Sequence, residues 1–200
     1  MRAILAFDSF KGSLSAAEAC SVVEGVFVAR GISVVSVPVA DGGEGTVAAL
    51  VRGSGGVVRR DSVRGPYGVP TTAERGLLPD GTAVVELAQA AGLVLAGGDL
   101  RVAEASTYGV GEQILAAARE GARRIVVGLG GSATNDGGCG AAAACGVVFR
   151  DAAGEAFVPV GASLRRVESI DVSGLDPAVA GSEIVAMCDV DNPLTGPHGA

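Results

Sequence analysis

The sequence predicts an α/β protein with a parallel βαβ unit at its N-terminus and a second α/β unit with a mixed or antiparallel sheet. Two observations carry this prediction. Before residue 57, apolar runs of strand length alternate with helix-length segments, which is typical of parallel strands joined by helices. After that point apolar and polar residues alternate, which indicates strands with one face toward solvent.

Two strands and two helices are expected in the first unit. Residues 2–7 and 33–39 are apolar, β-branched runs and predict the strands. The helix between them begins after Ser15, and Glu18 three residues later completes a capping box. A second helix is predicted at about 45–52, after the sequence DGGEG, so the unit reads βαβα.

The second unit is expected to begin near residue 65, which assigns 1–65 to the first domain and 66–200 to the second. Residues 57–64 and 70–87 alternate apolar with polar side chains, and Pro79-Asp80-Gly81 predicts a hairpin turn. The later elements are a helix at 106–121, a strand at 124–128, a helix at 137–145, a ribbon at 147–158, a short helix at 161–167 and a strand at 183–188.

Charge and composition exclude several classes of function. The net charge is −7 and no basic run exceeds two arginines, which argues against nucleic-acid binding. No apolar run approaches the ~20 residues of a membrane-spanning helix. The apolar stretch 3–7 is too short for a secretion signal, so we expect a cytoplasmic protein without a membrane partner. The four cysteines lack metal-site spacing and are expected to be reduced and mostly buried.

A glycine-rich loop, GLGGSATNDGGCG at 128–140, follows the apolar run 124–127. One interpretation is a tight turn that packs a following helix, for which Gly138 and Gly140 are candidates. The other is a phosphate-binding loop whose backbone amides approach an anion, for which Gly130 and Gly131 are candidates. In that case the helix near Gly137 should point its N-terminus into the same cleft as Lys11 and Asp8.

Acidic residues follow four apolar runs of the sequence. These are Asp8, Asp41, Asp136 and the pair Asp189 and Asp191. In open α/β sheets the ligand lies at the carboxyl ends of the strands, and aspartates beside glycine-rich loops suit a polyphosphate with Mg²⁺. Helix capping is the alternative for each single aspartate.

Lys11 is the only lysine in a chain whose other fourteen cationic residues are arginines, and it follows the first predicted strand. A compact ammonium is a good phosphate partner, which favours a functional role. Known loop signatures are absent: no P-loop pattern precedes Lys11, and Ala133 replaces the third glycine of a dinucleotide-binding loop. His198 is the only histidine and lies three residues from the end, which argues against a Ser-His-Asp triad.

Five segments together resemble the bacterial glycerate kinase family of the first type. They are DSFKGSLSAAEA at 8–19, DGGEGT at 41–46, STYGVGEQI at 106–114, GLGGSATNDGGCG at 128–140 and CDVDNPLTGPHGA at 188–200. The resemblance implies ATP-dependent phosphorylation of D-glycerate, usually to 2-phosphoglycerate, with ATP and Mg²⁺ required. It also implies a Rossmann-like domain that is split by the second domain, with the site in the cleft between them.

The resemblance also implies the site residues. The catalytic set is Asp8, Lys11, Asp41, Asp136 and Asp189. One of these four aspartates is expected to accept the hydroxyl proton and at least one to hold Mg²⁺, in an order that stays open. The expected substrate- and phosphate-binding residues are Ser9, Ser13, Gly42, Gly43, Glu44, Gly130, Gly131, Ser132, Asn135 and Asn192.

Members of that family are about twice as long as this chain. The sequence ends at Ala200, inside the last of the five segments, so a fragment, a truncated gene product and a trimmed form all stay open. The alternative function is therefore a truncated, non-catalytic fragment that binds phosphate or nucleotide. Homo-oligomerisation is also left open.

Overall fold

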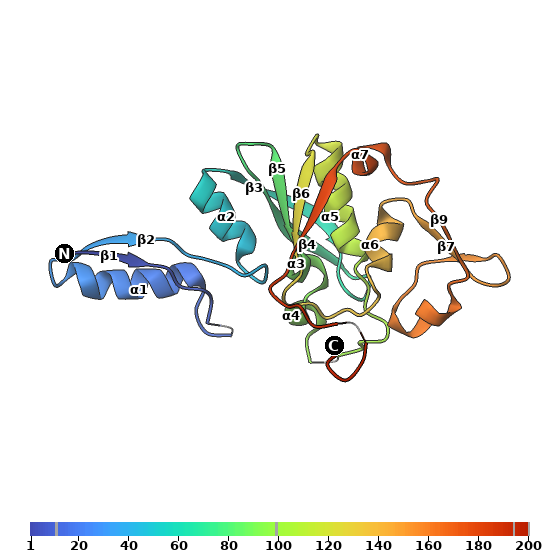
Figure 1. The fold of residues 1–200 in the computed structure, drawn as a ribbon, viewed down its shortest axis with the longest axis horizontal. Helices are drawn as coiled ribbons and strands as arrows, with labels where there is room; N and C mark the ends of the chain where they lie inside the picture. The colour runs from blue at the N-terminus through green and yellow to red at the C-terminus, as the bar shows by residue number, and fades with distance from the viewer. Residues whose placement is uncertain (11, 99, 194, 200) are drawn as a thin grey trace.

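The computed structural model describes residues 1–10, 12–98, 100–193 and 195–199. In this part of the chain the strands form three sheets, of two, five and three strands. Figure 1 shows the two-stranded sheet and its helix projecting from one side of a larger body that holds the other two sheets. The predicted mixed α/β class is confirmed.

The projecting unit contains β1 (Arg2–Leu5), α1 (Ala16–Val28) and β2 (Ser33–Ser36). The two strands pair in parallel, as predicted. The helix begins with the expected capping box, in which the Ser15 hydroxyl accepts from the amide of Glu18 and the Glu18 carboxylate accepts from the amide of Ser15. Backbone bonds from Val37 to Leu5 and from Val39 to Phe7 continue the pairing beyond the strands, toward Asp8.

The five-stranded sheet has the order β10-β6-β5-β4-β3. The neighbours β10, β6 and β5 run parallel, and β4 and β3 complete the sheet in antiparallel pairing. The bounds of these strands are β3 Val57–Arg64, β4 Pro70–Leu77, β5 Thr82–Glu86, β6 Arg124–Gly128 and β10 Glu183–Met187. Every residue of β5 is buried, because helices cover both faces of the sheet there.

Strand β3 and helix α2 (Thr46–Ser54) lie with this sheet, although the predicted boundary at residue 65 places them in the first domain. β3 pairs with β4 from Val57 to Arg64, and α2 packs against β3, β4 and β5. The physical reason is the short connection between β3 and β4, which makes them a hairpin. The predicted division into 1–65 and 66–200 thus cuts through this hairpin, and the domain count stays a prediction.

Helix α5 (Tyr108–Arg119) covers the face of the sheet opposite α2. Val84 and Gly76 face α2, whereas Ala83 and Val85 join the main core beneath α5. The other helices are α3 (Leu87–Ala91), α4 (Leu93–Ala96), α6 (Cys139–Ala144) and α7 (Pro177–Ala180). Of these, only α6 was expected from the sequence. None of the helices described is long and apolar enough to cross a membrane.

The three-stranded sheet lies at the far side of α6 and is antiparallel throughout. It contains β7 (Val148–Arg150), β8 (Ala156–Phe157) and β9 (Ser169–Asp171), with a 3₁₀ helix (Gly161–Arg166) between β8 and β9. The ribbon and short helix predicted here are confirmed. Strand β9 was missed, because its three residues carry too short a pattern to detect.

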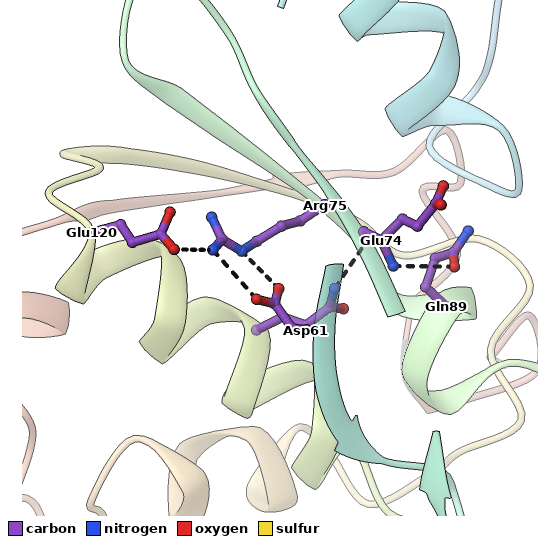
Figure 2. Close-up of polar contacts among 6 residues, drawn as sticks. Asp61, Glu74, Arg75, Gln89 and Glu120 are labelled. Carbon is purple, nitrogen blue, oxygen red and sulfur yellow. Dashed lines mark hydrogen bonds and ion pairs between the residues drawn. The ribbon is translucent and has the colours of Figure 1, made fainter. Parts of the chain in front are cut away.

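A buried ion pair ties the hairpin to α5. Figure 2 shows the Arg75 guanidinium between the carboxylates of Asp61 and Glu120. Its Nε lies 2.7 Å from Asp61 Oδ2, and Nη2 lies 2.7 Å from Glu120 Oε1. The Arg75 side chain is only 1% exposed, so the pair links β3, β4 and the end of α5 inside the protein.

Replacing Arg75 should be costly. Arg75→Ala is expected to lower the free energy of unfolding by about 3–5 kcal/mol, because it leaves the half-buried Asp61 carboxylate without its cation. The matched control is Arg60→Ala on the same hairpin, where the exposed pair with Glu74 should be worth less than about 1 kcal/mol. Urea unfolding measures both, and equal losses in the two variants would contradict the buried pair's role.

Candidate functional site

A cavity of about 750 Å³ opens at the carboxyl ends of the parallel strands. The register aligns the last residues of these strands, Glu86 of β5, Gly128 of β6 and Met187 of β10. The segments that follow each strand therefore meet at one edge of the sheet, which is where open α/β sheets bind ligands. The cavity is within the usual size range of small-molecule sites.

Two glycine-containing loops form the floor of this cavity through direct contact of their backbones. The amide of Gly130 donates to the carbonyl of Gly42 at 3.1 Å. A Cβ atom added to Gly130 would lie 2.6 Å from the Cα of Gly43, closer than real Cβ atoms come. Glycine is therefore required at Gly130 by close approach to the second loop. Neither interpretation of the sequence expected this contact, and the Gly130 amide is bonded within it.

Two adjacent amides on this floor are free to bind a ligand. Among the hydrogen bonds of the described residues, none uses the amide of Gly131 or Ser132 as a donor. Gly131 has φ +72°, a left-handed conformation that favours glycine, and both residues line the cavity. Successive free amides around a left-handed residue form an anion-binding concavity.

The wall of the cavity next to these amides comes from α4 and is apolar. Leu93, Val94 and Leu95 line the cavity and are exposed, Val94 by 83%. This wall is fixed to the glycine loop, because the amide of Leu93 donates to the carbonyl of Gly131 at 3.0 Å and the amide of Ala133 to Ala91 at 2.9 Å. The apolar wall and the free amides are thus held side by side.

Seven of the predicted site residues line the cavity, and they come from three separate segments. They are Asp41, Gly43, Glu44, Gly130, Gly131, Ser132 and Asp189. Lys11 lies outside the described residues, although the next residue, Gly12, is part of the lining. The structure does not bring the remaining predicted residues to the lining, namely Asp8, Ser9, Ser13, Gly42, Asn135, Asp136 and Asn192.

Asp136 has surroundings that favour the capping alternative. It is 1% exposed, and its Oδ2 accepts from the amide and hydroxyl of Thr107 at 2.8 and 2.9 Å. The amides of Gly138 and Gly140 donate to the same carboxylate, so Asp136 joins the starts of α5 and α6. The amides at the start of α6 are therefore already bonded, and the part of the loop that lines the cavity is 130–132.

Two other predicted residues have local partners. Asp8 Oδ1 accepts from the amide of Ser9 at 2.6 Å, at the end of the projecting unit. Asn192 is exposed and its Nδ2 lies 3.5 Å from the carbonyl of His198. Their assignment to the site stays a prediction.

Comparison with known proteins shows the family. A match to the glycerate kinase family covers residues 3–200. The chain belongs to this family. A relative named glycerate kinase, from Bacillus subtilis (strain 168), is 48% identical over 204 residues, which cover 100% of this chain and 53% of the relative. A second, named glycerate 2-kinase and from Escherichia coli (strain K12), is 45% identical and is covered to 54%.

The fold agrees with a solved structure of the glycerate kinase family. The crystal structure of a candidate glycerate kinase 2 from Salmonella typhimurium LT2 matches with a TM-score of 0.84 at 40% identity. The match covers 100% of this chain and 55% of that chain. The resemblance inferred from the five segments is confirmed, and the chain spans about half the length of the relatives it matches.

Sequence reasoning missed Glu86, Gln89 and Thr72, which also line the cavity. Glu86 could have been found. It ends the apolar run TAVVE, in the same position relative to a strand as the predicted aspartates. Gln89 and the apolar wall carry no such signal, because AQAAGLVLAGG has the composition of an ordinary buried segment.

The surroundings of the Glu86 carboxyl raise its pKa. Burial raises the pKa of its carboxyl above the ordinary value of 4.5, and the negative charge of Glu44 acts in the same direction. Hydrogen bonds from the backbone amides of Val47 and Gly45 and from the Gln89 side chain oppose this rise in pKa.

The carboxylates of the cavity suit Mg²⁺ in its usual manner of binding. Among the residues that the structure describes, no three acidic, histidine or cysteine side chains cluster as a metal site. Mg²⁺, however, is commonly held by one or two carboxylates together with substrate phosphates. Asp41 and Asp189 are exposed and line the same cavity as the free amides, so the residues present fit such an arrangement.

The glycine contact predicts a steric effect. Gly130→Ala should lower the free energy of unfolding by about 1–3 kcal/mol, because its methyl group would collide with the backbone of Gly43. Gly53→Ala is the control, since a Cβ there meets nothing within 4 Å. It should be neutral or stabilising by up to about 1 kcal/mol. A Gly130→Ala protein as stable as the control would show that the loops do not touch.

The raised pKa of Glu86 predicts a dependence of stability on pH. The folded protein holds the Glu86 proton more tightly than the unfolded chain, so the free energy of unfolding should fall as pH rises above 4.5. The free energy of unfolding stops falling once the pH exceeds the raised pKa of Glu86 in the folded protein. Glu86→Gln should remove this part of the pH dependence, whereas Glu155→Gln on an exposed turn should keep it. Urea titrations over the acid-to-neutral range measure the difference, and parallel curves for wild type and Glu86→Gln would contradict it.

Proposed function

We propose that this chain takes part in ATP-dependent phosphorylation of D-glycerate, giving 2-phosphoglycerate. The observation that carries the proposal is the pair of free amides at Gly131 and Ser132, which face the same cavity as Asp41 and Asp189. Anion-binding amides beside carboxylates are the parts that phosphoryl transfer requires. Family membership and the names of the relatives support glycerate as the acceptor.

In this proposal the chain's own groups position the reactants. The amides of Gly131 and Ser132 bind phosphate oxygens, and the wall formed by Leu93, Val94 and Leu95 packs against the base of the nucleotide. One of Asp41 and Asp189 accepts the proton of the glycerate hydroxyl, and the other helps to hold the metal ion. Asp8 remains a further candidate for either role.

Charge explains why the cation is needed. Asp41, Glu44, Glu86 and Asp189 all line the cavity, and two anionic substrates would add to their charge. Mg²⁺, when bound, supplies positive charge that stabilises the phosphates. Lys11 is proposed to bind a phosphate or the glycerate carboxylate, because Gly12 beside it lines the cavity.

A second candidate function is phosphate or nucleotide binding without turnover. The observation that favours it is the exposed apolar surface of the projecting unit, where Ile4 is 72% exposed, Val22 60% and Val28 57%. Apolar surface of this kind indicates a missing partner or a missing part of the fold. In that case the cavity binds its ligand but lacks a group needed for transfer.

Glycerate-dependent release of ADP by the purified chain decides between the two functions. We expect Asp189→Asn to lower kcat about 100-fold or more, because the proposal places this carboxylate at the reacting groups. The matched control is Asp191→Asn, an exposed aspartate outside the cavity lining, which should leave kcat within about twofold. Binding of Mg·ATP without any turnover would favour the second function, and equal effects of the two variants would remove Asp189 from the site.

A further inference from the structure

Glu86 is the one cavity-lining carboxylate with a buried side chain among the described residues. It is 1% exposed, whereas Asp41, Glu44 and Asp189 are exposed. No ion pair of Glu86 is found within the part of the chain that the structure describes. A buried carboxylate without a cation is unfavourable for folding, and such local conflicts are expected at functional sites.

Its two oxygens hold two different walls of the cavity. Oε1 accepts from the amide of Val47 at 2.5 Å, and Oε2 accepts from Gln89 Nε2 at 3.3 Å. Gln89 in turn accepts from the amide of Glu74 on β4 at 3.4 Å, and Figure 2 shows the Gln89 side chain reaching that strand. The carboxylate therefore connects the first turn of α2 with α3 and, through Gln89, with β4.

Helix α2 depends on this distant acceptor. Its N-cap residue is Gly45, which has no side chain to accept from the first helical amides. Glu86, which lies 39 residues after Val47, accepts from the Val47 amide in place of a local cap.

The bond from Val47 to Glu86 also helps to fix the acidic loop that precedes α2, because that loop is tied to the first turn of the helix. The Thr46 hydroxyl donates to the carbonyl of Gly43 at 2.8 Å, and the carbonyl of Gly42 accepts from Gly130. Asp41 Oδ1 accepts from the amide of Gly43 at 3.0 Å. Loop 41–45 is thus held at one end by the glycine contact and at the other by the turn that Glu86 binds.

We propose that Glu86 is a positioning residue, which holds loop 41–45 and the start of α2 so that Asp41 and Glu44 face the ligand. Glu86 acts as a hydrogen-bond acceptor of the correct length, and its negative charge is not required. It does not touch the reacting atoms. The identity of the ligand, Mg·ATP, rests on the proposed function.

Two variants distinguish the effect of the side-chain length at position 86 from the effect of its charge. Glu86→Asp keeps the charge but is one methylene too short to reach the amide of Val47. Glu86→Gln keeps the length and one acceptor oxygen for the amide of Val47, but it loses the charge and the bond accepted from Gln89. The control is Gln113→Leu, a fully buried side chain in the same core that donates to the carbonyl of Glu74 and lies outside the cavity lining.

The readouts are amide hydrogen exchange at residues 45–47 and the Kd for Mg·ATP by calorimetry, with Tm measured for each variant. We expect Glu86→Asp to reduce protection of these amides and to raise the Kd, each about tenfold. Glu86→Gln should stay within about threefold of wild type in both. Gln113→Leu should change Tm while leaving both readouts unchanged.

Two results would overturn the proposal. One is the reverse pattern, in which Glu86→Asp behaves as wild type and Glu86→Gln does not, because the charge would then be the essential feature. The other is a loss of Tm in both variants with exchange at 45–47 and Kd unchanged, as for Gln113→Leu. If the wild-type chain does not bind Mg·ATP, the proposed function fails, and exchange at 45–47 alone decides the role of Glu86.

Discussion

The backbone contact between the loops at 42–43 and 128–130 is the constraint on which the candidate site depends. It joins the segment that leaves the projecting unit to the end of the central parallel strand, without any side chain between them. Such an approach excludes every residue except glycine at Gly130. The free amides of the cavity, its acidic loop and its apolar wall are all fixed by their attachment to this contact.

Acidic residues near this backbone contact differ in their burial and in the hydrogen bonds they accept. Asp136 accepts four hydrogen bonds from the chain, which satisfies its carboxylate and joins the starts of two helices. Asp41 and Asp189 are exposed to the cavity and retain acceptor capacity for a cation. Asp136 and Asp189 both follow strands of the five-stranded sheet. Their chemistry differs because Asp136 is buried among hydrogen-bond donors.

The sequence predicts much of this fold for identifiable reasons. The Ser15 capping box and the Pro79-Asp80-Gly81 turn act locally, so the bounds of α1 and of the β4–β5 hairpin follow from nearby residues. The placement of β3 and the capping of α2 by Glu86 depend on residues far apart in the sequence. A helix whose cap comes from a strand 39 residues later has no local signal that sequence reasoning could detect.

The parallel pairing of β1 and β2 has a consequence for the two acidic residues that follow these strands. Backbone bonds continue as far as Phe7 and Val39, so Asp8 and Asp41 leave the projecting unit at the same end. Asp41 lines the cavity and Asp8 does not. The parallel pairing therefore brings the residues that follow β1 and β2 to one edge of the small sheet, and from that edge only the segment after β2 continues into the cavity lining with a carboxylate.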